Sequence, residues 1–445
     1  MYVGGSVLMS NKIYAKDLEK NKGKNIEFAG FVDRIKDLKY VKFIVLRDGT
    51  GKVQVTIEKN ANNAEILKKL KDLTLESTLN VKGILVDAPS VKMGGMEIIP
   101  EQVEITSLAE ELPLSYKEQG ISRSIRHDFR NLDLRTERNH LIFEIGTAFE
   151  AGLRDYCNQH DFIELHSPKI TAKAAESGSE VFKLKFFDQD AALSQSPQFY
   201  KQMAMSAGFD KVFEIGSAFR AEKSNTNYHA AEINMCDVEV SWVNDIKQIE
   251  KLEEEFLKTA FEKINNKYGE VIKSKFKTDL VNVDITIPRI SFYEAKTILK
   301  EKYNYLGEKN NDFDRKEELL LGKYALDTYK SDFIFVEGFP FESRAFYQQK
   351  DNQDNTRSYD LLYRGIEITT GALREHRYDK LIKQIQEKRI NLEELKNYLE
   401  LFRYGCPPHG GFGVGLSRVL MKTLNIDHIM DTNFIYRGPS RKLKL

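Results

Sequence analysis

The chain has 445 residues, of which 41% are apolar and 11% aromatic, so it can bury a sizeable core and a disordered chain is excluded. This length is too great for one compact core and predicts two or three domains. The 67 basic and 67 acidic residues cancel, which argues against a protein that covers DNA by bulk charge but is compatible with local basic patches.

Three widely separated cysteines, Cys157, Cys236 and Cys406, form no CxxC pair, which is typical of a reducing compartment. The first residues lack the charged lead and apolar core of a signal peptide. No run approaches the roughly 20 apolar residues that a membrane span needs. We therefore expect a cytoplasmic protein with no membrane partner.

Residues 26–105 alternate β-branched and aromatic residues between Gly, Asp and Pro breakers, as strands do. The expected strand segments are 26–32, 41–58, 78–89 and 96–105. Asp48-Gly49 is a hairpin-turn signal that divides the second segment in two. Five short strands with one helix, over 62–73, favour a small Greek-key barrel of the OB type.

Residues 106–130 are polar and show no sustained periodicity, which indicates a hinge. From residue 137 onward helices and strands alternate irregularly, which predicts an α+β domain with a largely antiparallel sheet. We expect helices over 137–161 and 245–270, the second with a solvated charged face. The expected strands are 162–170, 212–222, 232–242, 333–339 and 358–371.

Residues 219–232 place Arg220 and Glu222 two positions apart, on one face of the predicted strand, before a polar loop and His229. An arginine held by a rigid strand can clamp a phosphate or carboxylate with its bidentate fork. The alternative interpretation is a surface salt bridge on an edge hairpin.

Residues 405–424 form a glycine-rich segment that leads into a helix, with Arg418 in its first turn. A glycine-rich turn into a helix suits an anion. The spacing matches neither the P-loop nor the dinucleotide fingerprint, so a purely structural turn is the alternative.

Residues 359–376 carry Asp360, Glu367 and Arg374 at steps of seven. In a strand–turn–helix the two carboxylates could hold Mg²⁺ with phosphate oxygens, whereas the alternative is an ordinary half-buried strand. Residues 195–203 place Gln198 and Lys201 on the first turns of a helix. Taken by itself, this segment indicates only that Lys201 is a solvated lysine.

Taken together, these segments resemble class II aminoacyl-tRNA synthetases. Residues 143–170 resemble the family's motif 1, residues 219–232 its motif 2 and residues 410–418 its motif 3, and the class I signatures HIGH and KMSKS are absent. The barrel before this core resembles the aspartate, asparagine and lysine subgroup, closest to aspartyl-tRNA synthetases of archaeal and eukaryotic type. The resemblance implies an α+β chain: an OB-fold barrel in residues 1–111, a hinge over 112–136, and a catalytic domain in 137–445 with an antiparallel sheet flanked by helices.

The resemblance also implies site residues. For ATP they are Arg220, Glu222, His229, Glu367, Gly415 and Arg418, with Arg220 and Arg418 as the catalytic pair. For the amino acid they are Glu176, Gln198, Lys201, Asp237 and Arg374. Mg²⁺ would be held by Asp360, Glu367 and Thr370, and anticodon bases by Phe31, Phe43, Gln54 and Glu97.

The implied function is ATP-dependent activation of L-aspartate and its transfer to tRNA for aspartate or asparagine, by a homodimer formed through motif 1. One alternative is an asparagine–tRNA ligase or an enzyme that charges both tRNAs. Others are a synthetase-like protein that binds tRNA without charging it, and an enzyme that activates an amino acid for a different acceptor. DNA is not an expected partner.

Several positions depart from the family pattern, and these departures put ATP affinity and tRNA choice in question. They are Tyr228 for the arginine before the histidine, Ile233 or Asn234 for the aromatic under adenine, Ser417 for the glutamate before Arg418, Leu373 for the glutamine beside Arg374, Ala345 for a proline, and Phe31 for the barrel's tryptophan.

Overall fold

The computed structural model describes residues 12–113, 120–172, 180–224, 226–284, 286–439 and 441, and the chain forms two compact units, Met1–Glu137 and Arg138–Leu445. No helix in the described residues has the length and apolar character needed to cross a bilayer.

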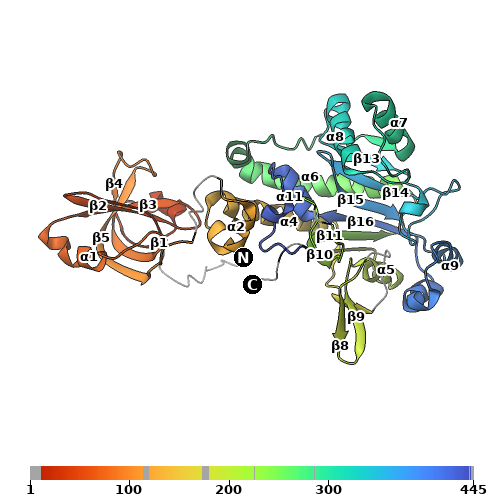
Figure 1. The fold of residues 1–445 in the computed structure, drawn as a ribbon, viewed down its shortest axis with the longest axis horizontal. Helices are drawn as coiled ribbons and strands as arrows, with labels where there is room; N and C mark the ends of the chain where they lie inside the picture. Colours follow the sequence, from red (N-terminus) through yellow and green to blue (C-terminus); the bar gives the residue numbers. More distant parts are fainter. Residues whose placement is uncertain are drawn as a thin grey trace. The chain divides into compact units, whose positions relative to one another are not determined.

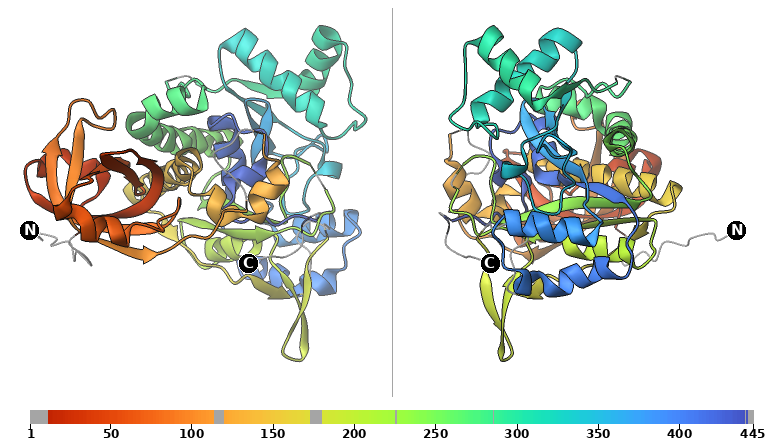
Figure 2. Two further views of the ribbon diagram at one scale, coloured as in Figure 1. Left: turned by 60° about the vertical axis from the view of Figure 1, so that its left-hand side comes forward. Right: turned by 90° about the vertical axis from the view of Figure 1, so that its right-hand side faces the viewer.

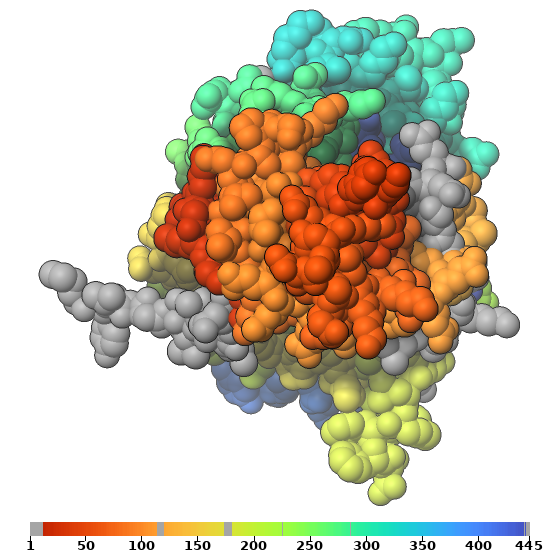
Figure 3. All heavy atoms as spheres, turned by 90° about the vertical axis from the view of Figure 1, so that its left-hand side faces the viewer, coloured from red at the N-terminus to blue at the C-terminus, as the bar shows by residue number. Residues whose placement is uncertain are grey.

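In the described residues the first unit contains a closed barrel of five strands in the order β1-β2-β3-β5-β4 (Figure 1). The strands are β1 (Asn25–Asp37), β2 (Val41–Arg47), β3 (Lys52–Glu58), β4 (Thr78–Asp87) and β5 (Met96–Ser107). Alternate residues such as Phe28, Ile44 and Val55 point inward and are fully buried. Figure 3 shows the outer side of this unit in red and orange. The predicted OB-type barrel is confirmed.

The segment expected as an irregular hinge is partly helical, with α2 (Arg123–Asp128) and α3 (Arg130–Asp133) joining the first unit. The carboxylate of Asp133, which is buried, accepts hydrogen bonds from Arg126 (3.1 Å) and Arg130 (2.5 Å). These pairs hold two turns that are too short and polar to show a helical period in the sequence.

In the described residues the second unit is built on an eight-stranded sheet with the order β12-β13-β14-β15-β16-β11-β10-β6. Its strands are β6 (Ile163–Glu164), β10 (Lys211–Phe219), β11 (Glu232–Ser241), β12 (Arg289–Ser291), β13 (Phe333–Glu337), β14 (Ser358–Tyr363), β15 (Ile366–Leu373) and β16 (His409–Gly415). Apart from the β12–β13 and β10–β6 pairs, neighbouring strands of these eight run antiparallel, as predicted.

A small sheet in the order β7-β9-β8 adjoins the large one, and its β8–β9 hairpin projects from the unit in both views of Figure 2. Its strands are β7 (Ile170–Ala172), β8 (Lys183–Phe186) and β9 (Gln189–Leu193). The first unit also contains helix α1 (Ala64–Lys69). The α-helices of the second unit are α4 (Glu137–Gln159), α5 (Gln198–Ser206), α6 (Ile246–Val271), α7 (Phe292–Tyr303), α8 (Arg315–Tyr329), α9 (Tyr378–Glu387), α10 (Lys396–Arg403) and α11 (Leu416–Thr423).

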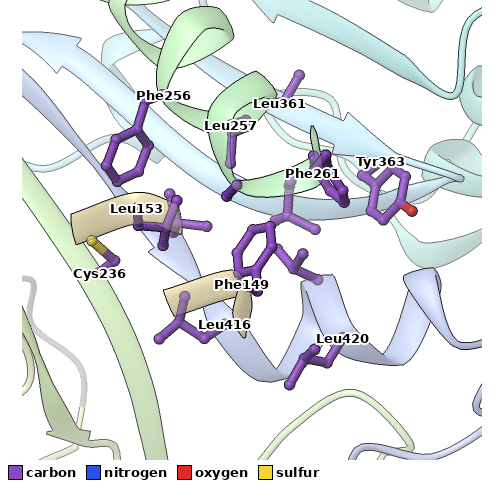
Figure 4. Close-up of a cluster of buried hydrophobic side chains, with 14 of the residues drawn as sticks. Phe149, Leu153, Cys236, Phe256, Leu257, Phe261, Leu361, Tyr363, Leu416 and Leu420 are labelled. Carbon is purple, nitrogen blue, oxygen red and sulfur yellow. The ribbon is translucent and has the colours of Figure 1, made fainter. Parts of the chain in front are cut away.

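The main core of the second unit lies where α4, α6 and α11 meet the sheet. Phe149 of α4, Phe261 of α6 and Leu420 of α11 converge with Leu361 of β14 (Figure 4). These helices carry their apolar residues at the three- and four-residue spacing that packs one face against a sheet.

The charged helix α6 is not simply solvated on its acidic side, which corrects the sequence interpretation. Glu250 and Glu253 are fully buried, because Arg289 Nε donates to Glu250 Oε2 (2.6 Å) and Tyr359 Oη donates to Glu253 Oε2 (2.5 Å). Burial raises the pKa of Glu253 to about 8. A run of charges on an amphipathic helix can therefore include core residues when the facing elements supply partners.

Three further segments differ from the prediction. Residues 162–170 contain the short strand β6 and only the first residue of the separate strand β7, and residues 358–371 belong to the hairpin β14–β15, whose turn holds Gly365 at φ +70°. The glycine-rich segment 410–415 belongs to β16 rather than to a turn.

At the end of β11, the largely exposed Trp242, the only tryptophan of the chain, donates its backbone N–H to Pro408 O (2.6 Å).

Candidate functional site

An open pocket in the second unit lies over β11, β15 and β16, between α5, the loop after β10 and the start of α11. It brings together most of the predicted ligand-binding residues. Those that line it are Gln198, Lys201, Arg220, Glu222, His229, Asp237, Glu367, Thr370, Arg374, Gly415 and Arg418. Asp360 lies behind this lining, and Glu176 falls outside the described residues.

At one end of the pocket, which we call the amino-acid end, four charged side chains form a buried network. Lys201 Nζ lies 3.0 Å from Asp237 Oδ1 and 3.2 Å from Glu239 Oε2. Arg374 binds Glu239 through Nε (2.9 Å) and Nη2 (3.2 Å). Each of the four is at most 5% exposed. Two positive and two negative charges therefore balance each other away from water.

Glu239 is the member of this network that the sequence prediction missed. Burial alone would raise its pKa, but Arg374 and Lys201 outweigh that effect and hold the pKa below its ordinary value. The carboxylate is therefore ionised and anchors both cations. A signal was present, because Asp237 and Glu239 stand two positions apart on β11 and so share a face of the sheet.

The glycines of β16 make room for these carboxylates. Gly411 pairs with Glu239, and Gly413 pairs with Asp237. A Cβ at Gly411 would lie 2.0 Å from Val238 O and 2.5 Å from Glu239 Oε2. The segment is glycine-rich because a neighbouring strand fills the space, not because the chain turns there.

Buried amides complete the amino-acid end. Gln198 Nε2 and Gln348 Oε1 line the pocket and have no hydrogen-bond partner in the described part of the chain. Arg374 Nη1 likewise makes no hydrogen bond within the described residues, whereas Nη2 also donates to Gly411 O (3.0 Å). Unsatisfied buried polar atoms cost free energy, so a polar ligand that pairs with them would be favoured.

His409 supports this end from behind. Its Nδ1 lies 2.8 Å from Pro407 O and its Nε2 lies 2.9 Å from Gln202 Nε2, so the neutral ring donates through Nδ1 and accepts through Nε2. Burial lowers the pKa of His409 to about 4. A second proton, on Nε2, would face the Nε2 amino group of Gln202, which cannot accept it. Tyr398 Oη fixes this amide by donating to Gln202 Oε1 (3.0 Å).

The opposite end of the pocket, which we call the phosphate end, is more open and cationic. β10 ends at Phe219, so Arg220 and Glu222 lie in the loop after the strand, which corrects the prediction. Arg220 N–H still bonds Ala231 O (2.8 Å), which anchors the backbone across the loop. No described residue bonds the Arg220 guanidinium, which lines the pocket.

His229 faces the same end. Its Nδ1 lies 2.5 Å from Thr226 Oγ1, and Tyr436 Oη donates to His229 O (2.9 Å). Burial, with Arg418 adding to it, lowers the pKa of the imidazole, which is therefore mainly neutral at pH 7. Nε2 of this ring is left for a ligand.

Arg418 enters from the first turn of α11. Its Nη1 donates to Glu367 O (2.9 Å) and its Nε to Tyr228 O (3.4 Å), while Nη1 lies 3.8 Å from Glu367 Oε2. Gly415 caps α11, and a Cβ there would make only ordinary van der Waals contacts, the nearest with Ile368 O (3.6 Å) and Arg418 Cδ (3.8 Å). Arg418 therefore ties the loop after β10 to β15.

A pair of carboxylates lies beside Arg418. Thr370 Oγ1 is 2.9 Å from Asp360 Oδ1 and 3.0 Å from Glu367 Oε1. Arg344 forks onto both oxygens of Asp360 (2.8 and 2.6 Å). Burial raises the pKa of Asp360 to about 6 although Arg344 opposes it, and the nearby Glu367 adds to the rise.

These residues fit Mg²⁺ only in part. Glu367 lines the pocket and keeps oxygen lone pairs free, whereas the oxygens of Asp360 are largely engaged by Arg344 and Thr370. No group of three or more His, Cys, Asp or Glu suited to a metal ion occurs in the described ranges. Mg²⁺ often uses one or two carboxylates plus substrate phosphates, a pattern that Glu367 can serve.

Four of the residues named as departures from the expected family pattern also line the pocket: Tyr228, Ile233, Asn234 and Ser417. Leu373 is buried in the core, and Ala345 only accepts a turn hydrogen bond from Gln348 N–H (3.1 Å). The departures therefore concentrate at the phosphate end, away from the buried charge network.

In the barrel, three of the four predicted anticodon residues share one outer region. Phe43 pairs with Thr56, and Gln54 pairs with Glu97, whose Oε2 accepts from Gln54 Nε2 (2.9 Å) and Thr56 Oγ1 (2.6 Å). Phe31 lies apart from them, with Arg47 (5.1 Å) and Arg135 (4.5 Å) over its ring.

Two family models match the chain. The model for tRNA synthetases class II (D, K and N) matches residues 122–435, and the OB-fold nucleic acid binding domain matches residues 26–106.

Relatives span nearly the whole chain. The aspartate–tRNA(Asp/Asn) ligase of Aeropyrum pernix is 38% identical over 94% of this chain and 95% of its own. The aspartate–tRNA(Asp) ligase of Pyrococcus abyssi is 40% identical over 95% and 97%. The crystal structure of asparaginyl-tRNA synthetase from Pyrococcus horikoshii with asparaginyl-adenylate superposes with a TM-score of 0.91 at 32% identity, over 98% of this chain and all of the other.

Proposed function

Since this chain belongs to the class II tRNA synthetases of the D, K and N group, we propose that it activates L-aspartate with ATP and transfers the aspartyl group to tRNA. As a family member it is an aminoacyl-tRNA synthetase, built from an OB-fold domain and a class II catalytic domain. The support for aspartate as the activated amino acid comes from the geometry of the site.

The buried network of Lys201, Asp237, Glu239 and Arg374 is the observation that carries this proposal. A β-carboxylate placed between Lys201 and the free Nη1 of Arg374 would add charge-assisted hydrogen bonds. Asp237, which also lines the pocket, would receive the α-ammonium group. An amide in the same place would leave buried cationic N–H groups poorly paired, which is how such sites discriminate strongly.

In the first step the substrate α-carboxylate would attack the α-phosphorus of ATP, forming aspartyl-adenylate and releasing pyrophosphate. The unpaired Arg220 would meet negative charge that develops at the α-phosphate, and Arg418 and the neutral His229 would bind the pyrophosphate portion. In the second step a terminal ribose hydroxyl of tRNA would attack the acyl carbon and release AMP. Such catalysis rests on positioning and on charge stabilisation rather than on a covalent enzyme intermediate.

Mg²⁺, when bound, would neutralise phosphate charge. Glu367 would hold the ion, with Asp360 and Thr370 fixing the Glu367 carboxylate from behind. Arg344 in turn fixes Asp360 by its two-point contact.

Asparagine is the second candidate substrate, favoured by the TM-score of 0.91 to an asparaginyl-tRNA synthetase. Amino-acid-dependent exchange of pyrophosphate into ATP separates the two. We expect exchange with aspartate and at most a trace with asparagine. Exchange that only asparagine supports would overturn the aspartate proposal, and no exchange with either would favour a tRNA-binding protein without charging activity.

The barrel is proposed to bind the anticodon through the outer region of Phe43, Gln54 and Glu97, because an aromatic ring and a polar edge suit unstacked bases. Phe43→Ala should raise the tRNA KM about tenfold or more, as the loss of one stacked base predicts. Pyrophosphate exchange into ATP, measured without tRNA, should stay unchanged in this variant. A fall in that exchange would show that the substitution damages the catalytic unit instead.

We further propose a homodimer in the cytoplasm. β6 is the edge strand of the large sheet, with Ile163 and, nearby, Ile170 about half exposed, and the three cysteines are unpaired thiols. Light scattering after size exclusion should give twice the chain mass. A monomer at assay concentration would contradict the dimer.

A further inference from the structure

Arg315, the first residue of α8, lies against the phosphate end although no sequence motif includes it. Its Cζ lies 4.2 Å from the ring centroid of Tyr228, and Tyr228 lines the pocket. A guanidinium over an aromatic face at this distance is a cation–π contact. Arg315 therefore contacts a residue of the pocket wall without lining the pocket itself.

Tyr228 is held by two arginines at once. Arg315 covers its ring, and Arg418 donates to its backbone carbonyl. Both arginines also bind carbonyls at the start of β15: Arg315 Nη1 donates to Gly365 O, and Arg418 Nη1 donates to Glu367 O. Because those residues are two apart, their Cα atoms are at most about 7 Å from each other. The two guanidinium groups are thus anchored side by side.

Part of the hydrogen-bonding capacity of Arg315 is unused. Nη1 also donates to Glu318 Oε2 (2.7 Å), but Nε and Nη2 are buried and have no partner in the part of the chain that the structure describes. Burial, and then Glu367, raise the pKa of Glu318 to about 7, while Arg315 and Arg418 oppose the rise. Glu318 is therefore only partly ionised near pH 7 and offsets the positive charge of Arg315 only in part.

We propose that the positive charge of Arg315, placed behind the ring of Tyr228, adds to that of Arg418 and favours binding of the terminal phosphates of a nucleoside triphosphate. The inference rests on the proposed use of ATP and adds a charge from α8 to that site. Arg315 does not itself line the pocket and its Nε and Nη2 are buried, so it acts through its charge and not through a direct hydrogen bond to the ligand. The positive charge acts on the outer phosphates, since Arg220 faces the inner part of the same end.

The test compares the binding of ATP and AMP by calorimetry, at fixed Mg²⁺ and without amino acid, because AMP lacks the outer phosphates. For Arg315→Leu we expect ATP binding to weaken about tenfold, as loss of one nearby positive charge predicts, with AMP binding within about twofold of wild type. Arg315→Lys should recover part of the loss. Lys316→Leu, on the next and solvent-exposed residue of α8, is the matched control and should bind ATP as wild type does.

Unchanged ATP binding in Arg315→Leu would overturn the proposal. An equal loss for ATP and AMP would also overturn it, since it would mean that Arg315 only supports the loop. Tyr228→Ala should reproduce the selective loss, because the ring holds the guanidinium in place. A wild-type chain that binds ATP but shows no aspartate-dependent exchange would contradict the proposed function while leaving this comparison intact.

Discussion

The two ends of the pocket achieve their charge balance in different ways. At the amino-acid end Lys201 and Arg374 are already paired with Asp237 and Glu239, and all four are buried. At the phosphate end Arg220 is unpaired within the described residues, and Arg418 reaches Glu367 mainly through its backbone. The first end is fixed before a ligand arrives, whereas the second keeps positive charge available for one.

This difference predicts where substitutions are tolerated. Each residue of the buried network depends on the others, so a change at one leaves a buried charge without its partner. The phosphate end should tolerate changes at Tyr228, Ile233 and Ser417, since these residues line the pocket outside the buried network.

The same substitution at the two ends should have unequal effects on stability, and this is the largest effect we expect. Glu239→Gln leaves Lys201 and Arg374 with one buried carboxylate and should lower the free energy of unfolding by about 3–5 kcal/mol. Glu367→Gln, at the open end, should change it by less than about 1 kcal/mol. Urea denaturation monitored by circular dichroism measures both, and equal losses would remove the distinction between the two ends.

Arg220→Ala should break the function of the phosphate end while leaving its structure intact. We expect aspartate-dependent pyrophosphate exchange to fall about 100- to 1,000-fold, as for other removed donors at a developing charge. The melting temperature should stay within a degree or two, because the guanidinium has no partner to lose among the described residues. Arg357→Ala, where an exposed arginine contacts only Asn244 O and Gln349, is the control for loss of an arginine.

Acid should weaken the amino-acid end through His409, whose pKa is about 4 in the folded chain and about 6.5 when unfolded. Below pH 6.5 the unfolded chain takes up a proton that the folded chain excludes, so stability is lost as the pH falls toward 4. The loss reaches about 3 kcal/mol by pH 4. His409→Gln should flatten the pH dependence of the unfolding free energy by that amount relative to wild type, and parallel curves would contradict it.

The smallest expected effect is a gain at the phosphate end. Ile233 lines the pocket where the family resemblance implies an aromatic ring beneath adenine. Ile233→Phe should tighten ATP binding several-fold, in line with about 1 kcal/mol for an aromatic stack. The aspartate KM should not change. Weaker ATP binding would show that the adenine base lies elsewhere in the pocket.

The barrel, the antiparallel sheet and most of the pocket could be predicted, because alternation along strands and the order of three motifs are local features of the sequence. Glu239 could also have been found, since its spacing from Asp237 places both carboxylates on one face of β11. Lys201 alone indicated only a solvated lysine, and its burial depends on β11 and β16, which lie far away in the chain.

Other features depend on tertiary contacts that have no local signal. Gly411 favours a turn by its own conformational freedom, but its position opposite Glu239 makes it part of a strand. Glu253 belongs to a charged helix face until Tyr359 is packed against it. Arg315 contacts Tyr228 at the pocket wall only because α8 and the loop that carries Tyr228 fold together, across 87 positions of sequence.

The single tryptophan, Trp242, gives the second unit an optical reporter that the first unit lacks. It is tethered to Pro408, next to His409, so its fluorescence follows unfolding of the catalytic unit alone, whereas far-ultraviolet dichroism follows both units. Coincident transitions would mean that the barrel and the catalytic unit unfold as one cooperative body, and separate transitions that they unfold independently. The unequal distribution of one residue type thus makes the thermodynamic coupling between the two units accessible without any label.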